Sequence, residues 1–162
     1  MLALLAAIAL ASAPADDYGW DEDEGSYREG RPRLHLTALV GEAFQVGSRD
    51  GVSGAAVGGE AAWSFDALDL GVAGYGYRLR TSEREWVPVA LLRLTQRARG
   101  RGGIEALFSF GVGAGKPLRS WDLWFQVGLG VRVPLGPMFL AGELAFEQYD
   151  LLRLQGGVGA RF

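Results

Sequence analysis

The sequence has no cysteine and only one histidine, His35, among its 162 residues. Disulfide bonds, thiolate metal sites and metal sites built from several histidines are therefore excluded. Outside the extreme N-terminus, no apolar run reaches the roughly 20 residues that a membrane-spanning helix needs. The chain must therefore be held together by hydrogen bonds, side-chain packing and charge pairs.

Motifs for catalysis or cofactor binding are also lacking. A Ser-His-acid site would have to use His35, and nothing in the sequence resembles such a site. The glycine-rich segment 111–116 differs from a phosphate-binding loop, because Phe110 and Pro117 stand where that loop needs glycine and Ser or Thr. We therefore expect no enzyme activity, no cofactor and no nucleic-acid partner.

The N-terminal part of the chain differs in composition from the rest. Residues 1–15 form an apolar run ending in Ala13-Pro14-Ala15, which is typical of a secretory signal peptide and its cleavage site. Residues 16–30 hold seven acids against Arg28 and show no periodicity, so we expect 16–32 to be a disordered acidic tail. The later part of the chain is mildly basic, with fifteen Lys or Arg against twelve acids.

The rest of the chain, 33–162, divides into eight runs of strand length separated by turn residues. Its connections are short, which favours an all-antiparallel up-and-down arrangement. A closed sheet with an even number of strands has no free edge, as a membrane requires. We therefore predict an eight-stranded antiparallel transmembrane β-barrel with strands near 34–46, 54–65, 68–79, 86–96, 104–114, 121–135, 138–148 and 151–162.

The segment 121–135 shows the pattern most clearly, since its odd positions are all apolar and its even positions include Asp122, Gln126 and Arg132. Successive side chains of a strand point to opposite faces, so one face is apolar and the other polar. A cation facing lipid costs about 2–4 kcal/mol at the bilayer midplane, so the charged face must line the lumen. The expected lumen charges are Glu60, Arg93, Glu105, Arg132, Glu143, Glu147, Arg153 and Arg161.

A barrel of eight strands encloses space only for side chains or one small ligand, so its internal charges must pair. We expect Glu147 directly across from Arg153, with the hairpin turn between them at 148–150. The turn at 136–137 sets Gly130 opposite Glu143, which places Arg132 diagonally near Glu143. These pairs would form a structural network of salt bridges in the lumen.

Further placements follow from the same alternation. Glu60 and Arg93 would flank Ala73, and Tyr75 and Tyr77 would point inward. Glu42 is assigned inward in the first strand, and Arg97, Arg99 and Arg101 to a solvated turn at 97–103. Bulky aromatic residues sort to the two ends of the barrel, as interfacial girdles do. They are Trp86, Trp121 and Phe146 near the outer interface, and Trp63, Phe65 and Phe162 near the inner one.

The last run, LLRLQGGVGARF, has outward apolar residues at alternate positions and ends on Phe162. It resembles the C-terminal signature by which bacterial outer-membrane barrels are recognised for assembly. With the leader and eight runs, residues 33–162 are similar to the small eight-stranded barrels of the OmpA/OmpX type. The resemblance implies export through the periplasm to the outer membrane, contact with outer-membrane lipid and lipopolysaccharide, and a role for the barrel-assembly machinery.

Three functions remain open from the sequence. The first is a structural or interaction component of the outer membrane with a largely plugged lumen. The second is a narrow channel or small-ligand carrier, suggested by the inward glycines and by Tyr75 and Tyr77. The third is a soluble lipocalin-like barrel, which would require the opposite facing of apolar and charged side chains.

Overall fold

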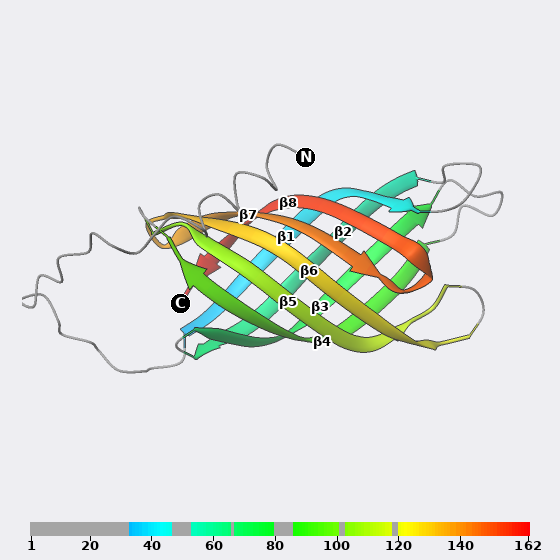
Figure 1. The fold of residues 1–162 in the computed structure, drawn as a ribbon, viewed down its shortest axis with the longest axis horizontal. Helices are drawn as coiled ribbons and strands as arrows, with labels where there is room; N and C mark the ends of the chain where they lie inside the picture. Colours follow the sequence, from blue (N-terminus) through cyan, green and yellow to red (C-terminus); the bar gives the residue numbers. More distant parts are fainter. Residues whose placement is uncertain (1–32, 47–52, 66, 80–85, 101–102, 118–119) are drawn as a thin grey trace, which may run out of the picture.

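The computed structural model describes residues 33–46, 53–65, 67–79, 86–100, 103–117 and 120–162, so the predicted leader and acidic tail lie outside it. The chain forms a closed barrel in which each strand pairs with its neighbours in sequence and β1 pairs with β8 (Figure 1). No helix in the described residues is long and apolar enough to cross a membrane. The strands are β1 (Arg33–Gln45), β2 (Ser53–Phe65), β3 (Leu68–Leu79), β4 (Trp86–Arg99), β5 (Glu105–Gly115), β6 (Asp122–Leu135), β7 (Met138–Glu147) and β8 (Leu151–Arg161).

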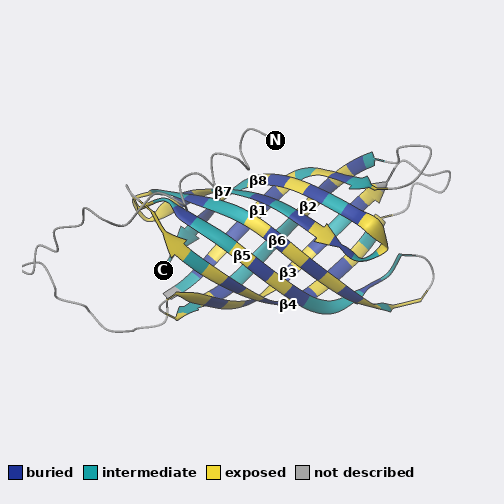
Figure 2. Cartoon of the chain, viewed as in Figure 1, coloured by how far each residue is buried: buried dark blue, intermediate teal, exposed yellow. Residues whose placement is uncertain are grey.

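All strand pairs are antiparallel, which confirms the predicted eight-stranded up-and-down barrel. Burial alternates along the strands, so exposed and buried residues follow each other in bands around the wall (Figure 2). In β6, for example, Trp124 and Gln126 are buried while Leu123 and Phe125 are exposed. The period-two pattern of the sequence is therefore the pattern of the two faces of the wall.

The start of β1 and the C-terminal residue lie at the same end of the barrel, because Phe162 donates its backbone N–H to Leu34. We call this the terminal end, and the end with the β1–β2, β3–β4, β5–β6 and β7–β8 connections the loop end. The β6–β7 turn at the terminal end contains Gly136 at φ +66°, which only glycine adopts without strain. At the loop end, the short 3₁₀ turn Gln148–Asp150 holds both Tyr149 and Asp150 at positive φ.

Two predicted placements in the wall are wrong. Glu42 is exposed on the outer face, because β1 keeps a regular alternation with His35, Thr37 and Leu39 buried. Glu42 lies close to the end of β1 at Gln45, where a charge on the outer face costs little. Arg78, near the same end of the barrel, is likewise exposed on the outer face.

The predicted turn at 97–103 begins too early, because β4 continues to Arg99. Arg97 therefore belongs to the wall, and its guanidinium points into the barrel rather than into solvent. The basic residues of this segment had suggested a solvated turn, but two internal carboxylates stabilise Arg97 within the strand. Arg101 lies outside the described residues.

Candidate functional site: the charged lumen

The inner face of the barrel carries all eight of the charged residues that the sequence singled out, together with others. Seven of them are almost completely buried, and Arg161 is 24% exposed at the terminal end. They separate into two groups along the barrel. The central cluster consists of Glu60, Arg93, Glu143, Glu147 and Arg153, and the basic cluster consists of Asp69, Arg97, Arg99, Glu105, Arg132 and Arg161.

Arg93, on β4, is the hub of one half of the central cluster. Its guanidinium binds Glu60 of β2 at 3.0 Å and also Glu143 of β7. It also donates to the Tyr75 hydroxyl at 2.9 Å and to the Ser109 hydroxyl at 2.8 Å. One side chain thereby links five strands across the enclosed space.

Arg153, on β8, is the hub of the other half and is 0% exposed. It donates to Glu147 at 2.8 Å and to Glu143 at 2.7 Å, and it also binds Gln155. Its guanidinium carbon lies 3.6 Å from the centroid of the Tyr75 ring, which places the cation over the aromatic face. Arg153 therefore has partners on three sides, as a buried charge requires.

Glu147 is held by neutral donors as well as by Arg153. The Tyr77 hydroxyl lies 2.8 and 2.7 Å from its two oxygens, and the Trp124 indole N–H donates at 2.8 Å. The rings of Tyr77 and Trp124 stack with centroids 6.4 Å apart, and Trp124 packs in turn on Tyr149 at the loop end. The inward placement expected for Tyr75 and Tyr77 is observed, and their hydroxyls serve the charge network.

The expected pairing within the network is only partly right. Glu147 faces Leu151 in the strand register, and Arg153 faces Ala145, so the ion pair is diagonal rather than direct. Gly130 does face Glu143, as the turn length indicated. The partner assigned to Arg132 is wrong, because strand register does not determine which way a long side chain leans.

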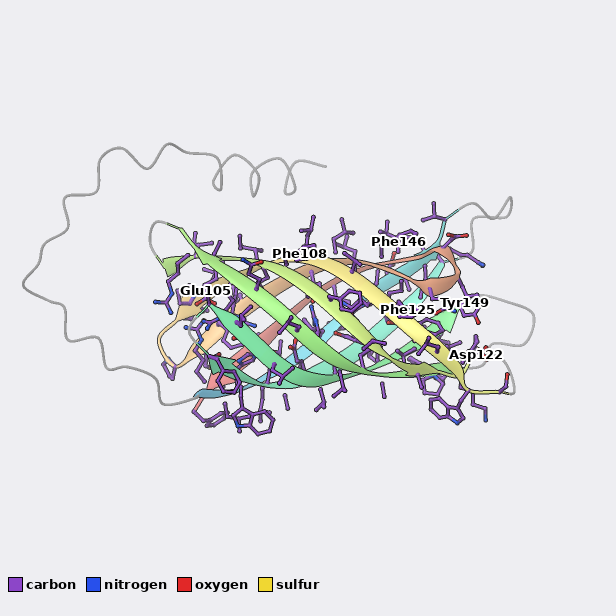
Figure 3. All side chains as sticks on the ribbon, turned by 60° about the horizontal axis from the view of Figure 1, so that its bottom comes forward. Glu105, Phe108, Asp122, Phe125, Phe146 and Tyr149 are labelled. Carbon is purple, nitrogen blue, oxygen red and sulfur yellow. The ribbon has the colours of Figure 1, made fainter. Side chains whose placement is uncertain are left out.

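Arg132 instead belongs to the basic cluster at the terminal end, where several arginines share Glu105. Figure 3 shows Glu105 toward this end of the barrel, with Asp122 and Tyr149 toward the other. Arg161 binds Glu105 at 2.8 Å, and Arg132, Arg97 and Arg99 lie at 3.5, 3.6 and 3.6 Å from it. Asp69 binds Arg97 at 2.9 Å and Arg132 at 3.2 Å. Two buried carboxylates thus hold four guanidinium groups in the part of the chain that the structure describes.

Sequence reasoning missed Asp69 and Arg97 as members of the lumen. Asp69 is 0% exposed, and it lies between the apolar Leu68 and Leu70, which are both exposed on the outer face. The alternation of that strand therefore already implied an inward carboxylate. Arg97 was missed because the strand was ended one residue before it.

His35 is also buried in the lumen, between Ser64 and Asp69. Its Nδ1 lies 3.4 Å from the Ser64 hydroxyl, and its Nε2 lies 3.8 Å from Asp69. Arg132 lies 3.4 Å from the same Nε2, and a guanidinium can only donate. Both ring nitrogens therefore lie beside polar or charged groups of the lumen wall. His35 is thus part of the buried polar packing of the lumen.

The six aromatic residues assigned to the girdles are all exposed on the outer face. Trp63, Phe65 and Phe162 lie toward the terminal end, and Trp86, Trp121 and Phe146 lie toward the loop end. Phe146 is visible on the outside of the wall near the loop end (Figure 3). Among the described residues, no group of three or more His, Cys, Asp or Glu side chains is arranged to hold a metal ion.

Comparison with known proteins finds similarity in structure only. No protein-family model matches the chain, and no curated protein sequence matches it. Neisserial surface protein A superposes with a TM-score of 0.69 at 12% sequence identity, over 80% of this chain and 97% of that one.

Two further solved structures show the same likeness. The N-terminal β-barrel domain of Pseudomonas aeruginosa OprF superposes with a TM-score of 0.62 at 14% identity, over 83% of this chain and 100% of that one. A structure from the de novo design of transmembrane β-barrels gives a TM-score of 0.61 at 15% identity, over 82% and 98%. The chain therefore has the fold of the small eight-stranded outer-membrane β-barrels.

Proposed function

We propose that the protein is a transmembrane barrel of the bacterial outer membrane that is closed to solutes and acts there as a structural or interaction component. The observation that carries this proposal is the distribution of charge. Ionised side chains are buried and paired in the lumen, while the outer face is apolar except near its ends, where Glu42 and Arg78 are exposed. No catalytic role is part of the proposal, and the fold comparisons agree with a membrane barrel.

The outer face has the character of a surface in contact with lipid. Soluble monomers expose contiguous apolar patches of only a few hundred Å², whereas here every strand contributes to one apolar band. In a lipocalin-like barrel the apolar side chains point inward and the polar ones outward, which is the opposite of the arrangement here, so the structure argues against that alternative. The band includes the exposed side chains of Leu36, Val57, Leu70, Leu92, Phe108, Leu129, Leu140 and Leu154.

The ion pairs support a closed lumen because they run across it and not only along its wall. Arg93 on β4 binds Glu143 on β7, and Arg161 on β8 binds Glu105 on β5 at 2.8 Å. Each pair joins strands that are three places apart in a barrel of eight. A solute would have to separate these pairs, and leaving a fully buried charge without its partner costs about 3–5 kcal/mol.

Membrane fractionation and planar-bilayer recordings test the two halves of the proposal. We expect the chain to sediment with the outer membrane and the refolded barrel to show no steady conductance. Arg93→Ala removes the side chain that links five strands, so this variant should show small openings. Arg78→Ala removes an exposed arginine and should remain closed. Steady pores in the unaltered protein, or recovery in the aqueous fraction, would contradict the proposal.

A narrow channel is the second candidate, and one observation favours it. Several buried polar atoms have no hydrogen-bond partner within the part of the chain that the structure describes, including Gln126 Oε1, Thr95 Oγ1 and Gln155 Nε2. Such atoms are usually satisfied by water, and connected water would provide a path for small ions. If this candidate is right, the unaltered barrel conducts and Glu143→Gln changes its ion selectivity.

We also propose that the chain is exported and that the barrel-assembly machinery recognises its last strand. Phe162 is 71% exposed beside the strand that closes the barrel, which leaves its ring available to a partner. Phe162→Ala is expected to reduce the amount of barrel in the outer membrane without changing the stability of barrel refolded in vitro. Equal amounts in the membrane would remove this part of the proposal. Contact with lipopolysaccharide is proposed for the girdle residues at the loop end.

A further inference from the structure

We propose that the acidic N-terminal segment, residues 16–30, binds the basic cluster at the terminal end of the barrel and acts as its counterion. The proposal does not depend on the outer-membrane assignment or on the conductance of the lumen. It depends on the charge of the basic cluster, on the exposure of two of its arginines and on the place where the chain enters the barrel.

The basic cluster has more positive than negative charge among the described residues. Arg97, Arg99, Arg132 and Arg161 surround the carboxylates of Asp69 and Glu105, and Glu105 is within 3.6 Å of all four. One carboxylate has two oxygens and cannot neutralise several guanidinium groups. The buried guanidinium groups of Arg97 and Arg132 are matched in number by the two carboxylates, so the excess positive charge lies on the more exposed Arg99 and Arg161 and would attract an anion.

Two members of the cluster are open to such an anion. The Arg99 side chain is 70% exposed and that of Arg161 is 24% exposed, whereas Arg132 is only 4% exposed. Arg99 and Arg161 therefore face the mouth at the terminal end, and Glu105 lies behind them. Each guanidinium carries five N–H donors in a planar fork, and one carboxylate contact leaves several donors for a second acidic group.

The nearest source of acidic groups is the chain itself. Residues 16–30 contain seven acids and one arginine, and only residues 31 and 32 separate this segment from the start of β1. An extended chain covers about 3.3–3.6 Å per residue, so most of the segment can reach the mouth. A short tether raises the effective concentration to the millimolar range, which favours this segment over dilute external anions.

A spin label tests the proposal directly, because the chain has no cysteine of its own. Ser26→Cys places a nitroxide within the acidic segment of the full mature chain, refolded in zwitterionic detergent. We expect an immobilised component in the electron paramagnetic resonance spectrum at low ionic strength. This component should be lost at about 1 M salt, where the Debye length falls to about 3 Å.

Substitutions on both sides separate the proposal from other causes of immobilisation. Arg99→Gln together with Arg161→Gln should remove the immobilised component, while Arg78→Gln, which alters an exposed arginine toward the loop end, should preserve it. Glu105 keeps Arg97 and Arg132 as partners in the double variant, so the barrel should still fold. Neutralising Asp21, Glu22, Asp23 and Glu24 to their amides should have the same effect as the double variant.

Four results would overturn the proposal. A label that is mobile at low salt would show that the segment does not bind. Immobilisation that survives both sets of substitutions would show that charge is not its cause. Immobilisation that occurs only in anionic bilayers, or binding of inorganic phosphate to the cluster with no change in the label, would assign the cluster to a lipid head group or a free anion instead.

Discussion

Replacement of Arg153 by methionine is the substitution that most directly tests the energetic role of the lumen. Methionine keeps an unbranched apolar chain but removes the guanidinium that donates to Glu147 and Glu143. Breaking a buried ion pair on one side costs about 3–5 kcal/mol, because the partner charge stays buried without its counterion. Whole domains are stable by only about 5–15 kcal/mol, so this loss is a large fraction of the total.

The structure places the expected loss for Arg153→Met at the lower end of that range, about 3 kcal/mol. Glu147 retains the Tyr77 hydroxyl and the Trp124 indole as donors. Glu143 likewise retains Arg93 and the side-chain amide of Gln126, at 3.1 Å. Each carboxylate therefore keeps at least one hydrogen-bond donor when the Arg153 guanidinium is removed.

Urea unfolding of the barrel in phospholipid vesicles, followed by tryptophan fluorescence, would measure this loss for Arg153→Met. The double variant with Glu147→Gln should recover part of it, with a coupling of about 0.5–3 kcal/mol for residues in direct contact. Arg78→Met is the control, and it should be neutral or stabilise by up to about 1 kcal/mol, since it removes a charge from the outer face near the interface. The reasoning fails if Arg153→Met unfolds like the unaltered protein, or if the two substitutions are strictly additive.

Three other predictions concern the wall and its two ends. Gly157→Ala should destabilise the barrel by about 1–3 kcal/mol, because a Cβ there would collide with the backbone carbonyl of Ala38. Gly74→Ala should be tolerated, because its Cβ would meet nothing closer than 4.0 Å, and equal urea midpoints for the two variants would contradict this reasoning. The hydrogen bond to Asp122 at 3.1 Å raises the pKa of the exposed Tyr149 phenol, so its stabilising effect is present below the ordinary tyrosine pKa of about 10 and is lost as the pH rises through the higher folded value. Ultraviolet difference titration against Tyr149→Phe should show this shift, and Asp122→Asn should abolish it; an unchanged titration in that variant would remove the assigned cause. Brominated lipids should quench Trp63, Trp86 and Trp121 but not the buried Trp124, each measured in a variant with that single tryptophan, and quenching of Trp124 would show that the facing is wrong.

The architecture was largely predictable because alternation and turn length act locally. In β6 and β8, side chains at odd and even positions point to opposite faces of the wall, so placing one charged residue in the lumen fixes the facing of all the others. The end of β4 was predicted too early because the strand continues through a long charged side chain, Arg97, where the apolar residues stop. Arg97 has a partner inside the barrel, and a pattern of residue types along one segment cannot reveal that partner.

The pairing within the lumen was harder to predict for a different reason. Register determines which backbone positions lie opposite each other, and it correctly set Gly130 against Glu143. An arginine side chain, however, extends over several residues of the wall and reaches strands that are not its neighbours. Arg132 therefore binds Asp69, 63 positions away in the sequence, which no hairpin connects to it.

The pairing of the first strand with the last also limits how the barrel can form. His35 pairs with Arg161, so the sheet has two open edges until nearly the whole chain has been made. A chain shortened by one strand would present those edges to other molecules and would tend to aggregate rather than form a smaller barrel. Closure is thus a late event with a high entropic cost, since it joins segments from opposite ends of the polypeptide.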